Sequence, residues 1–412
     1  QPSGAQVKPK PDSGEPASVG NDAADASFAA RITWWRPEPF GAWLRLGEGT
    51  LVAIDRSLRA RLGLDPYRSP RVPTAPLEAH VGITRRCDCC CEGCYQSSGP
   101  DGLEPPFEDI VRALRQMAGL GVATVAFGGG EPLLRTDIGD IARATRDLGM
   151  IPVTTTSGAC LTADRVGELR DFAQINVSHD GVDGVYARSR GWDGAPGAER
   201  AIAMLSEAGI AVGANMLLAR GVLSAVEPTA RRVAELGAGE LQLLRYKPAG
   251  RGANMYDARA LRSEEIGQLG ALLRRLSASS SLSIRVDCAL LPLLADVFLG
   301  EPGAVELLRK TGVFGCEAGR YLSGVSVEGA LVPCSCWSAG GSAGGWDDDV
   351  EMRRIRAWHA ALVEPCASCG LSDICRGGCQ VVSRFRSGAL GPDPECPRVL
   401  RHGAADREPQ AR

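Results

Sequence analysis

Short apolar stretches alternate with amphipathic stretches along residues 77–277, and this alternation restricts the possible folds more than any other feature of the chain. The apolar stretches, which predict β-strands, are 79–84, 122–127, 151–156, 175–178, 210–218 and 241–246. Helical periodicity lies between and after them, near 106–119, 137–148, 162–171, 197–208, 223–236 and 263–277. Six strand-then-helix units in tandem favour an α/β fold built on a parallel sheet. Because a closed TIM barrel needs eight such units, we expect residues 76–285 to form a partial (β/α)6 barrel of the TIM type.

The segments on either side of this region differ from it in composition. Residues 1–30 contain almost no large apolar side chains, so they are expected to form a disordered tail. Within 31–75, short β-like stretches predict a hairpin and a helix. A packing cap on the barrel is favoured there over the start of a peptide-leader recognition domain, because small hairpins rarely stand alone. Residues 286–400 are rich in Gly and Cys and predict a small domain whose core is too small to be stable without cross-links. A second tail is expected at 401–412.

The chain contains 15 cysteines among its 412 residues. No window approaches the ~20 apolar residues of a transmembrane helix, and the first residues lack the apolar core of a signal peptide. These features predict a cytoplasmic protein, in which thiols stay reduced and act as metal ligands or catalytic groups rather than as disulfides. The formal net charge of −3 offers no electrostatic case for a nucleic-acid or membrane-surface partner.

Five of the cysteines lie in the segment CDCCCEGCY (87–95), directly after the first expected barrel strand. Only Cys87, Cys91 and Cys94 fit the spacing C-x3-C-x2-C, because a start at Cys90 would need a third cysteine where the chain has serine. Three thiolates in one loop can bind three irons of a [4Fe–4S] cluster and leave the fourth iron open. Barrel enzymes carry their chemistry at this end of the strands. A zinc knuckle or a group of inert thiols is the alternative interpretation.

The second expected strand ends in the sequence GGGEP (128–132). Glycines let a ligand approach the backbone closely, and Glu131 offers an acceptor for an ammonium group. Taken alone this signal is weak, because glycine-rich turns between strands and helices are common in α/β proteins.

Together, the spaced cysteines, the aromatic Tyr95 that follows them and the GGEP turn resemble the radical SAM superfamily. The resemblance implies that the open iron is chelated by the amino and carboxyl groups of S-adenosylmethionine. It also implies that Gly129, Gly130 and Glu131, followed by Pro132, bind the methionine amino group.

The resemblance continues through the ends of the next two strands and the loop beyond them. It assigns Ser178 and Arg190 to the methionine carboxylate or the ribose, with Asp180 beside them, and it places Ser157 where the family commonly has asparagine. On the residues alone, Ser178 and Asp180 are equally well explained as turn caps. For Arg190 the alternative is a solvated loop arginine, and the ligand contact is slightly favoured over it.

Seven further cysteines lie after residue 315 in a fixed spacing that no zinc ribbon matches, since a ribbon stops at four ligands. The spacing C-x12-G-x4-C, then C-x2-C-x5-C-x3-C and a final cysteine, resembles the SPASM domain of radical SAM enzymes. By that resemblance an outer auxiliary [4Fe–4S] cluster is held by Cys366, Cys369, Cys375 and Cys396. An inner auxiliary cluster is held by Cys316, Cys334 and Cys379.

The fourth ligand of the inner cluster is open to two interpretations. Many relatives have another cysteine six residues after the first, where this chain has Leu322. Either Cys336 completes the cluster or one iron stays open to substrate, and the open iron is slightly favoured. The remaining thiols are expected to be buried or spare, namely Cys89, Cys90, Cys160 and Cys288.

Most of residues 77–400 resembles the mycofactocin maturase branch, through FGGGEP (127–132), KPAGRG (247–252), CRGGC (375–379) and GPDPEC (391–396). The resemblance implies three [4Fe–4S] clusters and reductive cleavage of S-adenosylmethionine to a 5′-deoxyadenosyl radical. This radical would abstract a hydrogen from a precursor peptide, leading to oxidation, decarboxylation or crosslinking of a side chain. Expected partners are that peptide, a separate peptide-carrier protein and an electron donor such as flavodoxin or ferredoxin.

Two other functions are compatible with the sequence. One is a radical SAM oxidase or decarboxylase of a small molecule in tetrapyrrole or antibiotic synthesis. The other is a non-catalytic zinc or iron–sulfur electron carrier. No residue stands out as a catalytic acid or base, although Tyr95, Arg245, Tyr246 and Asp257 are candidates for the lining of a cavity.

Overall fold

The computed structural model describes residues 23–38, 40–47, 50–64, 75–311, 313–337 and 345–405. In this part of the chain the main sheet has nine strands in the order β10-β9-β8-β7-β6-β5-β4-β11-β12. All neighbours from β10 to β11 are parallel, and only β12 runs antiparallel to its neighbour. The strands are β4 (Glu78–Thr84), β5 (Thr124–Gly129), β6 (Ile151–Thr156), β7 (Gln174–Ser178), β8 (Val212–Leu218), β9 (Glu240–Arg245), β10 (Ser283–Val286), β11 (Leu322–Val325) and β12 (Leu331–Val332).

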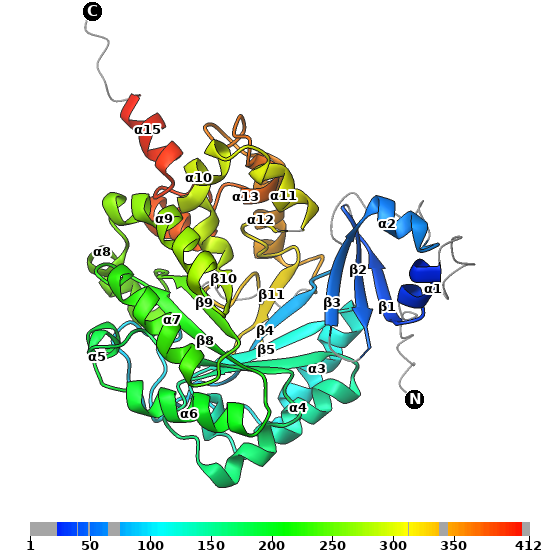
Figure 1. The fold of residues 1–412 in the computed structure, drawn as a ribbon, viewed down its shortest axis with the longest axis vertical. Coiled ribbons are helices and arrows are strands. Elements are labelled where there is room, and N and C mark those ends of the chain that lie inside the picture. Colours follow the sequence, from blue (N-terminus) through cyan, green and yellow to red (C-terminus); the bar gives the residue numbers. More distant parts are fainter. Residues whose placement is uncertain are drawn as a thin grey trace, which may run out of the picture.

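Helices follow these strands and cover one side of the sheet, where Figure 1 shows α3, α4, α6 and α7 side by side. The α-helices of this region are α3 (Phe107–Leu120), α4 (Ile138–Asp147), α5 (Val185–Arg190), α6 (Ala195–Glu207), α7 (Val226–Glu235), α8 (Tyr256–Arg259) and α9 (Ser263–Ser279). The short 3-10 helices are η1 (Pro132–Leu134), η2 (Ala163–Leu169), η3 (Leu223–Ala225), η4 (Gly250–Met255) and η5 (Cys288–Leu294).

Helix α3 illustrates why these segments fold as they do. Acidic residues stand in its first turn, where they favour the positive end of the helix dipole, and Gly121 ends it in the left-handed conformation with φ 80°. Ile110, Leu114 and Met117 recur at helical spacing and are buried. They belong to one continuous core that joins the parallel strands to their crossover helices.

The predicted partial barrel is confirmed, with two differences. The stretch expected as a helix near 162–171 forms the 3-10 helix η2. In addition, β10 and β11 extend the sheet at its two sides as further parallel strands. Neither extension has a clear sequence signal, because each has only four residues and β11 contains a glycine. Each forms by pairing with the free edge of a longer strand, β10 with β9 and β11 with β4.

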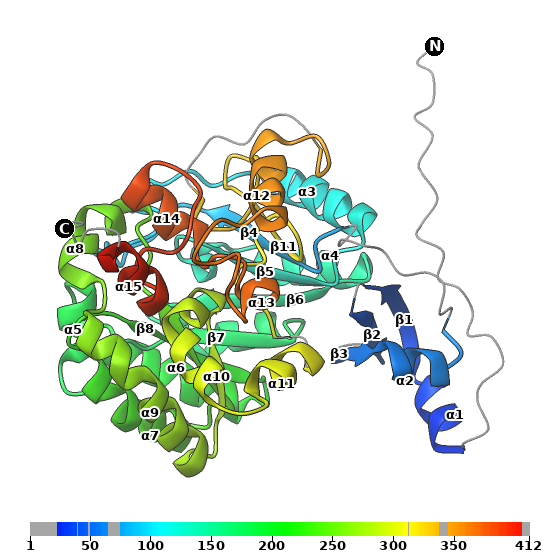
Figure 2. The same ribbon diagram turned by 90° about the horizontal axis from the view of Figure 1, so that it is seen from above.

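The N-terminal segment forms a separate antiparallel sheet in the order β1-β2-β3, from Ile32–Pro37, Gly41–Leu46 and Thr50–Asp55. Helix α2 (Arg56–Arg61) follows it, as expected for a hairpin and a helix. The expected tail at 1–30 is partly wrong, because α1 (Ala23–Ala29) is helical and Ala29 packs in the core of the small sheet. Residues 1–22 of that tail lie outside the described residues. Figures 1 and 2 show this small sheet to one side of the main sheet.

The cysteine-rich C-terminal region contains more helix than its weak periodicity predicts. Its helices are α10 (Ala295–Gly300), α11 (Ala304–Lys310), α12 (Val350–Ala360), α13 (Ser372–Cys375), α14 (Gln380–Ser387) and α15 (Pro397–Ala405). Most are too short to show an amphipathic pattern, and loops carry most of the cysteines. Helix α15 crosses the expected start of the second tail at 401, and residues 406–412 lie outside the described part. No helix among the described residues is long and apolar enough to cross a membrane.

Candidate active site

The loop after β4 carries the first group of cysteines. Its ends are joined where the Cys87 N–H donates to the Gly99 carbonyl at 2.9 Å, next to a parallel bridge between Arg86 and Gly99. A hydrogen bond from Cys89 lowers the pKa of Cys87 to about 7, against the opposing effect of burial. The loop therefore presents Cys87 as a sulfur that ionises readily, as a metal ligand must.

Cys91 accepts hydrogen bonds at its sulfur. Trp192 donates through Nε1 at 3.2 Å, and the Arg190 guanidinium lies at 3.9 Å. The Arg251 guanidinium holds the Cys91 carbonyl through Nε and Nη2 at 3.1 and 2.8 Å. Donors aimed at a sulfur are the surroundings expected of a thiolate bound to iron, because they compensate its negative charge.

Arg190 itself is fixed by an ion pair with Asp180. The Arg190 Nε to Asp180 Oδ2 distance is 2.6 Å, and Asp180 Oδ1 accepts the Leu217 N–H at 2.9 Å. Burial works against the charge of Arg190, but the Asp180 carboxylate outweighs it, so the pKa of Arg190 lies well above its usual value. Arg190 also lies over the Tyr186 ring, 5.2 Å from its centroid. The interpretation of Arg190 as a solvated loop residue is therefore wrong.

The glycine turn after β5 packs tightly against the cysteine loop. Gly129 has φ 122°, and a Cβ placed there would lie 2.1 Å from the Thr84 carbonyl oxygen. A Cβ on Gly130 would lie equally close, 2.1 Å from the Arg86 oxygen. Both positions need glycine, because a side chain would separate the two loops that form the site.

Glu131 is buried and accepts four hydrogen bonds from its own chain. Oε1 accepts from the Leu133 N–H at 3.0 Å and from the Thr156 hydroxyl at 2.7 Å. Oε2 accepts from Ser157 twice, from its N–H at 2.7 Å and from its hydroxyl at 2.6 Å. A carboxylate has about four acceptor positions, so Glu131 can bind an ammonium group only if one donor leaves. Hydroxyl donors can rotate away, and that of Ser157 is held less tightly than that of Thr156, because Ser157 Oγ accepts the Ala159 N–H at 3.3 Å whereas Thr156 Oγ1 accepts the Gly158 N–H at 2.9 Å.

Tyr95 lies beside the same turn. Its hydroxyl oxygen is 3.6 Å from the position a Cβ would take on Gly128, while its side chain is 40% exposed. Burial of the hydroxyl and the neighbouring Cys336 and Cys94 thiols raise the pKa of Tyr95. Tyr95 thus reaches from the first cysteine group towards a cysteine of the C-terminal region.

The KPAGRG segment (247–252) packs against the cysteine loop. Gly250 has φ 52°, and a Cβ there would lie 2.5 Å from the Tyr95 carbonyl and 2.6 Å from the Cys94 carbonyl. The Tyr246 hydroxyl donates to the Gly252 carbonyl at 3.1 Å. The segment therefore contacts the cysteine loop directly.

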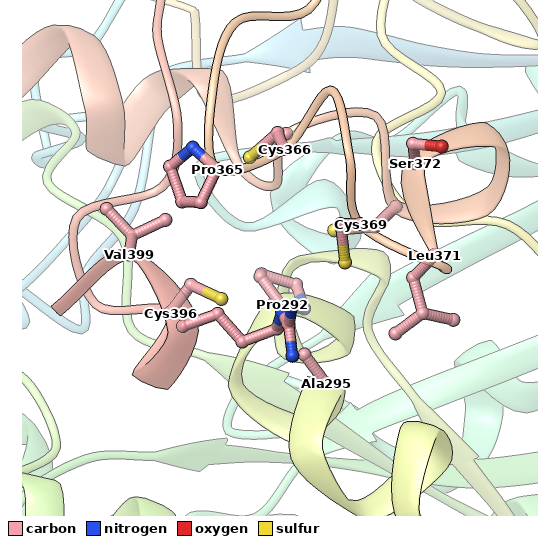
Figure 3. A pocket seen from close by; sticks show the side chains of 12 residues that line it. Pro292, Ala295, Pro365, Cys366, Cys369, Leu371, Ser372, Cys396 and Val399 are labelled. Atoms are coloured by element: carbon pink, nitrogen blue, oxygen red, sulfur yellow. The ribbon is translucent and has the colours of Figure 1, made fainter. Parts of the chain in front are cut away.

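Four cysteines of the C-terminal region surround one small hollow, shown in Figure 3. The hollow has an empty volume of about 370 Å³, part of it open to solvent, and apolar side chains such as Pro292, Leu371 and Val399 line it between the sulfurs. The four cysteines are Cys366, Cys369, Cys375 and Cys396. Burial raises the pKa of three of these thiols, to about 12 for Cys366, and the cysteines raise one another's further. Four converging sulfurs in an apolar surrounding fit the four-thiolate ligand set of a [4Fe–4S] cluster.

A second group gathers around a partly buried ion pair between Lys247 and Asp287. It contains the three predicted inner-cluster thiols, Cys316, Cys334 and Cys379, and two further thiols, Cys288 and Cys336. Each of the five interacts electrostatically with another of them or with Lys247. Burial raises the pKa of each of the five, to about 12 for Cys379. The thiols fit an iron–sulfur cluster, because iron stabilises the thiolate form that burial disfavours.

Some predicted residues lie elsewhere or have other contacts. Asp257 is not a cavity residue, because its side chain is 81% exposed and pairs with Arg386. Arg245 is buried in an ion pair with Asp393. Ser178 ends β7 opposite Asn215 of β8, and Pro132 begins η1 directly after Glu131, so both stay at the edge of the sheet that carries the site.

Sequence reasoning missed several residues of this site. Trp192, Arg251 and Thr156 contact the predicted residues from other elements. Burial and, as a smaller cause, the Glu131 carboxylate raise the pKa of Cys160 to about 12. Arg251 lies in the KPAGRG segment, which could have identified it, whereas Trp192, Thr156 and Cys160 belong to no spacing pattern. Within the described ranges, no group of three or more His, Cys, Asp or Glu side chains is placed to hold a single metal ion. In a four-iron cluster each thiolate binds a different iron.

Residues 81–232, which include the cysteine loop and the strand ends around it, match the Radical SAM superfamily. The chain contains a radical SAM domain. This domain marks the chain as an enzyme, and its core is the partial barrel that carries Cys87, Glu131 and Arg190.

Relatives extend the likeness beyond the radical SAM domain. The chain is 28% identical over 344 residues to mycofactocin maturase MftC of Mycolicibacterium smegmatis, covering 78% of this chain and 83% of MftC. It is 26% identical over 343 residues to the PqqA peptide cyclase of Bradyrhizobium diazoefficiens, covering 78% and 86%. The fold resembles Streptococcus suis SuiB bound to S-adenosylmethionine, with a TM-score of 0.68 and 18% identity over 88% of this chain and 98% of SuiB. A second SuiB structure, bound to the precursor peptide SuiA, has a TM-score of 0.67.

Proposed function

We propose that this chain is a radical SAM maturase that modifies a side chain of a ribosomally made precursor peptide. The observation that carries the proposal is that its likeness to peptide-modifying enzymes spans the partial barrel and the cysteine-rich region together. The net reactions proposed for that side chain are oxidation, decarboxylation or crosslinking. A flavodoxin or ferredoxin is the proposed electron donor.

Cys87, Cys91 and Cys94 would hold the cleavage cluster. When bound, this [4Fe–4S] cluster and S-adenosylmethionine supply reductive cleavage of a sulfonium and abstraction of a hydrogen atom from the substrate. The chain contributes orientation, because Gly129 and Gly130 hold the turn against the cysteine loop. Trp192 and Arg190 compensate the charge on the Cys91 sulfur.

Glu131 would bind the methionine amino group, after the Ser157 hydroxyl gives up its bond to Oε2. The backbone N–H of Ser157 and the Thr156 hydroxyl would keep the carboxylate in place meanwhile. Arg190 would face the methionine carboxylate or ribose, with Asp180 fixing its direction.

The two C-terminal cysteine groups would hold two auxiliary clusters. The group around Lys247 adjoins the cleavage loop, because Gln96 donates to the Ser335 carbonyl at 3.1 Å. Tyr95, Lys247 and Cys336 interact in this region, so we propose that the modified side chain lies there. Cys316, Cys334 and Cys379 would hold an auxiliary cluster beside it, which would supply one-electron redox chemistry for oxidation of a substrate radical.

The test begins with cleavage of S-adenosylmethionine under dithionite after anaerobic reconstitution. The Cys87/Cys91/Cys94→Ala variant should form no 5′-deoxyadenosine, whereas Cys90→Ala should retain activity, because Cys90 is exposed and outside the spacing pattern. Unchanged cleavage by the triple variant would overturn the assigned cluster.

The peptide substrate requires a second experiment. Short peptides encoded beside the gene are incubated with the reconstituted enzyme and reductant, and their masses are measured. A mass change that depends on S-adenosylmethionine is expected. Cleavage that leaves every such peptide unmodified, while a small molecule from the same gene cluster is oxidised, would contradict peptide maturation.

A further inference from the structure

We propose that Cys288 is the fourth thiolate ligand of the inner auxiliary cluster, beside Cys316, Cys334 and Cys379. This inference rests on the proposed function, because the inner cluster belongs to it. At the position where the SPASM resemblance implies a further cysteine, this chain has Leu322, which cannot ligate iron. Leu322 pairs with Glu78 as the first residue of β11, and in this chain a thiol from another element is available.

The first argument is the fixed position of Cys288 next to Cys379. Cys288 begins η5, where the carbonyl of the following residue, Ala289, accepts a hydrogen bond from Arg245 Nη1 at 2.9 Å. The same Nη1 lies 2.6 Å from Asp393 Oδ2, and this oxygen accepts the Cys379 N–H at 3.0 Å. One guanidinium–carboxylate pair therefore ties the start of η5 to the backbone of Cys379.

The second argument is the contact between η5 and the segment that carries Cys316. A Cβ on Gly315 would lie 3.1 Å from Leu291 Cδ2 of η5 and 2.8 Å from the Cys375 carbonyl oxygen. The residue before Cys316 thus packs directly against η5. The segments that carry two predicted ligands, Cys316 and Cys379, are therefore both tied to η5, which begins with Cys288.

The electrostatic surroundings agree with this placement. Cys288 lies directly after Asp287 and interacts electrostatically with Cys316, Cys379 and Lys247. The Lys247 ammonium interacts with Cys288, Cys336 and Cys379 and is itself held by Asp287. A fixed cation beside several thiolates compensates the negative charge that they bring to a cluster.

Cys336, the ligand considered from sequence, interacts with Cys334 but also lies beside the cleavage loop. Its neighbour Ser335 accepts from Gln96 of the cleavage loop through its carbonyl at 3.1 Å, and its hydroxyl lies 3.0 Å from His80 Nδ1. The Cys336 thiol contributes to the raised pKa of Tyr95. Cys336 therefore lines the space between the cleavage loop and the inner cluster, where substrate is proposed to lie.

The experiment compares Cys288→Ala with Cys336→Ala in the full-length Cys87/Cys91/Cys94→Ala background, so that only auxiliary clusters are present. The iron content and the electron paramagnetic resonance (EPR) spectrum of the reduced protein are measured, with and without added cyanide. The parent should hold about eight irons in two four-iron clusters. Cys288→Ala should change the inner-cluster signal and make it sensitive to cyanide, while the outer-cluster signal shows that the domain remains folded. Cys336→Ala should leave both signals and the iron content unchanged.

An inner-cluster signal that Cys288→Ala leaves unchanged would overturn the inference, as would equal changes in both variants. These outcomes differ from failure of the proposed function, in which the parent itself would hold only about four irons, or zinc in their place.

Discussion

At the residue scale, the hydrogen bond from Trp192 to Cys91 should set the potential of the cleavage cluster. The Nε1 to Sγ distance is 3.2 Å, and hydrogen bonds to cluster sulfurs favour the more negative, reduced state. Trp192→Phe should therefore lower the reduction potential of this cluster, measured by EPR-monitored redox titration. Trp43→Phe is the control, because Trp43 belongs to the small N-terminal sheet and its Nε1 has no hydrogen-bond partner. An unchanged potential in Trp192→Phe would show that this bond is lost when the cluster forms.

The crowded carboxylate of Glu131 gives a second prediction at this scale. A hydrogen bond to a charged group contributes about 1.5–3 kcal/mol, so Glu131→Gln should weaken S-adenosylmethionine binding by about 10- to 100-fold. Ser157→Ala should change the affinity by less than about threefold, because the Ser157 hydroxyl is proposed to leave Oε2 when the ligand binds. Equilibrium binding to the reconstituted enzyme measures both. A large loss in Ser157→Ala would instead make this hydroxyl part of the bound state.

Sequence reasoning succeeded at this scale where chemistry depends on spacing along one segment. The four cysteines that meet around the outer hollow could be predicted as a group because their positions are largely fixed by local spacing, and the assignment of Cys87, Cys91 and Cys94 as ligands stays a prediction of the same kind. Trp192 and Cys288 could not be predicted, since their partners come from elements distant in sequence and no pattern marks either residue. The crowding of Glu131 was equally invisible, because Thr156 and Ser157 approach it from the neighbouring strand.

At the scale of elements, the contact between the cysteine loop and the KPAGRG segment is set by Gly250. Gly250→Ala combines the left-handed strain of about 1–2 kcal/mol with a clash against two carbonyl groups, which adds about 1–3 kcal/mol. Gly209→Ala is a matched control, because Gly209 has φ 72° but nothing within 4 Å of its Cβ position. Denaturant unfolding should show the larger loss for Gly250→Ala, accompanied by less iron in the cleavage cluster. Equal losses would mean that the two loops can separate without cost.

The attachment of the small N-terminal sheet should depend on pH through Glu38. Glu38 is fully buried, accepts the Tyr321 hydroxyl at 2.8 Å and pairs with Arg36 at 2.7 Å. Burial raises the pKa of Glu38 above its usual value despite both partners. A raised pKa in the folded state contributes stability that is complete below the unfolded pKa and is lost as the pH rises through the folded pKa.

Glu38→Gln should therefore remove part of this pH dependence. The stability of the natural chain relative to Glu38→Gln should fall as the pH rises from about 4.5 towards neutrality. Denaturant unfolding at several pH values measures the difference. A difference that grows with pH would mean that the ion pair with Arg36 outweighs burial.

The element boundaries were largely predictable because a parallel sheet repeats one sequence pattern. Strand β6, for example, has the predicted bounds, and its neighbours differ by one or two residues. The edge strands β10 and β11 were not predictable, because four residues carry too little pattern.

At the scale of the whole molecule, the barrel and the cysteine-rich region are joined by a buried ion pair. Arg245 ends β9, and its guanidinium contacts Asp393 at 2.6 Å and Glu395 at 2.9 Å, with side chains 2% exposed for Arg245 and 0% for Asp393. Asp393 also accepts the Cys379 N–H, so one carboxylate connects the sheet to a proposed cluster ligand. Asp393→Asn would leave the Arg245 charge buried with Glu395 alone.

Asp393→Asn should thus destabilise the protein by about 3 kcal/mol, at the low end of the range for a broken buried pair because Glu395 remains. Asp296→Asn is the matched control, since its pair with Arg401 joins α10 to α15 but both side chains are exposed by more than two-fifths. Exposed pairs contribute about 0–1 kcal/mol.

Asp393→Asn should also lose iron from the auxiliary sites while S-adenosylmethionine is still cleaved, since the Cys87/Cys91/Cys94 loop is held by Gly250 and Arg251 instead. Equal loss of cleavage and auxiliary iron would mean that the two regions fold as one cooperative unit rather than as a barrel with a docked domain.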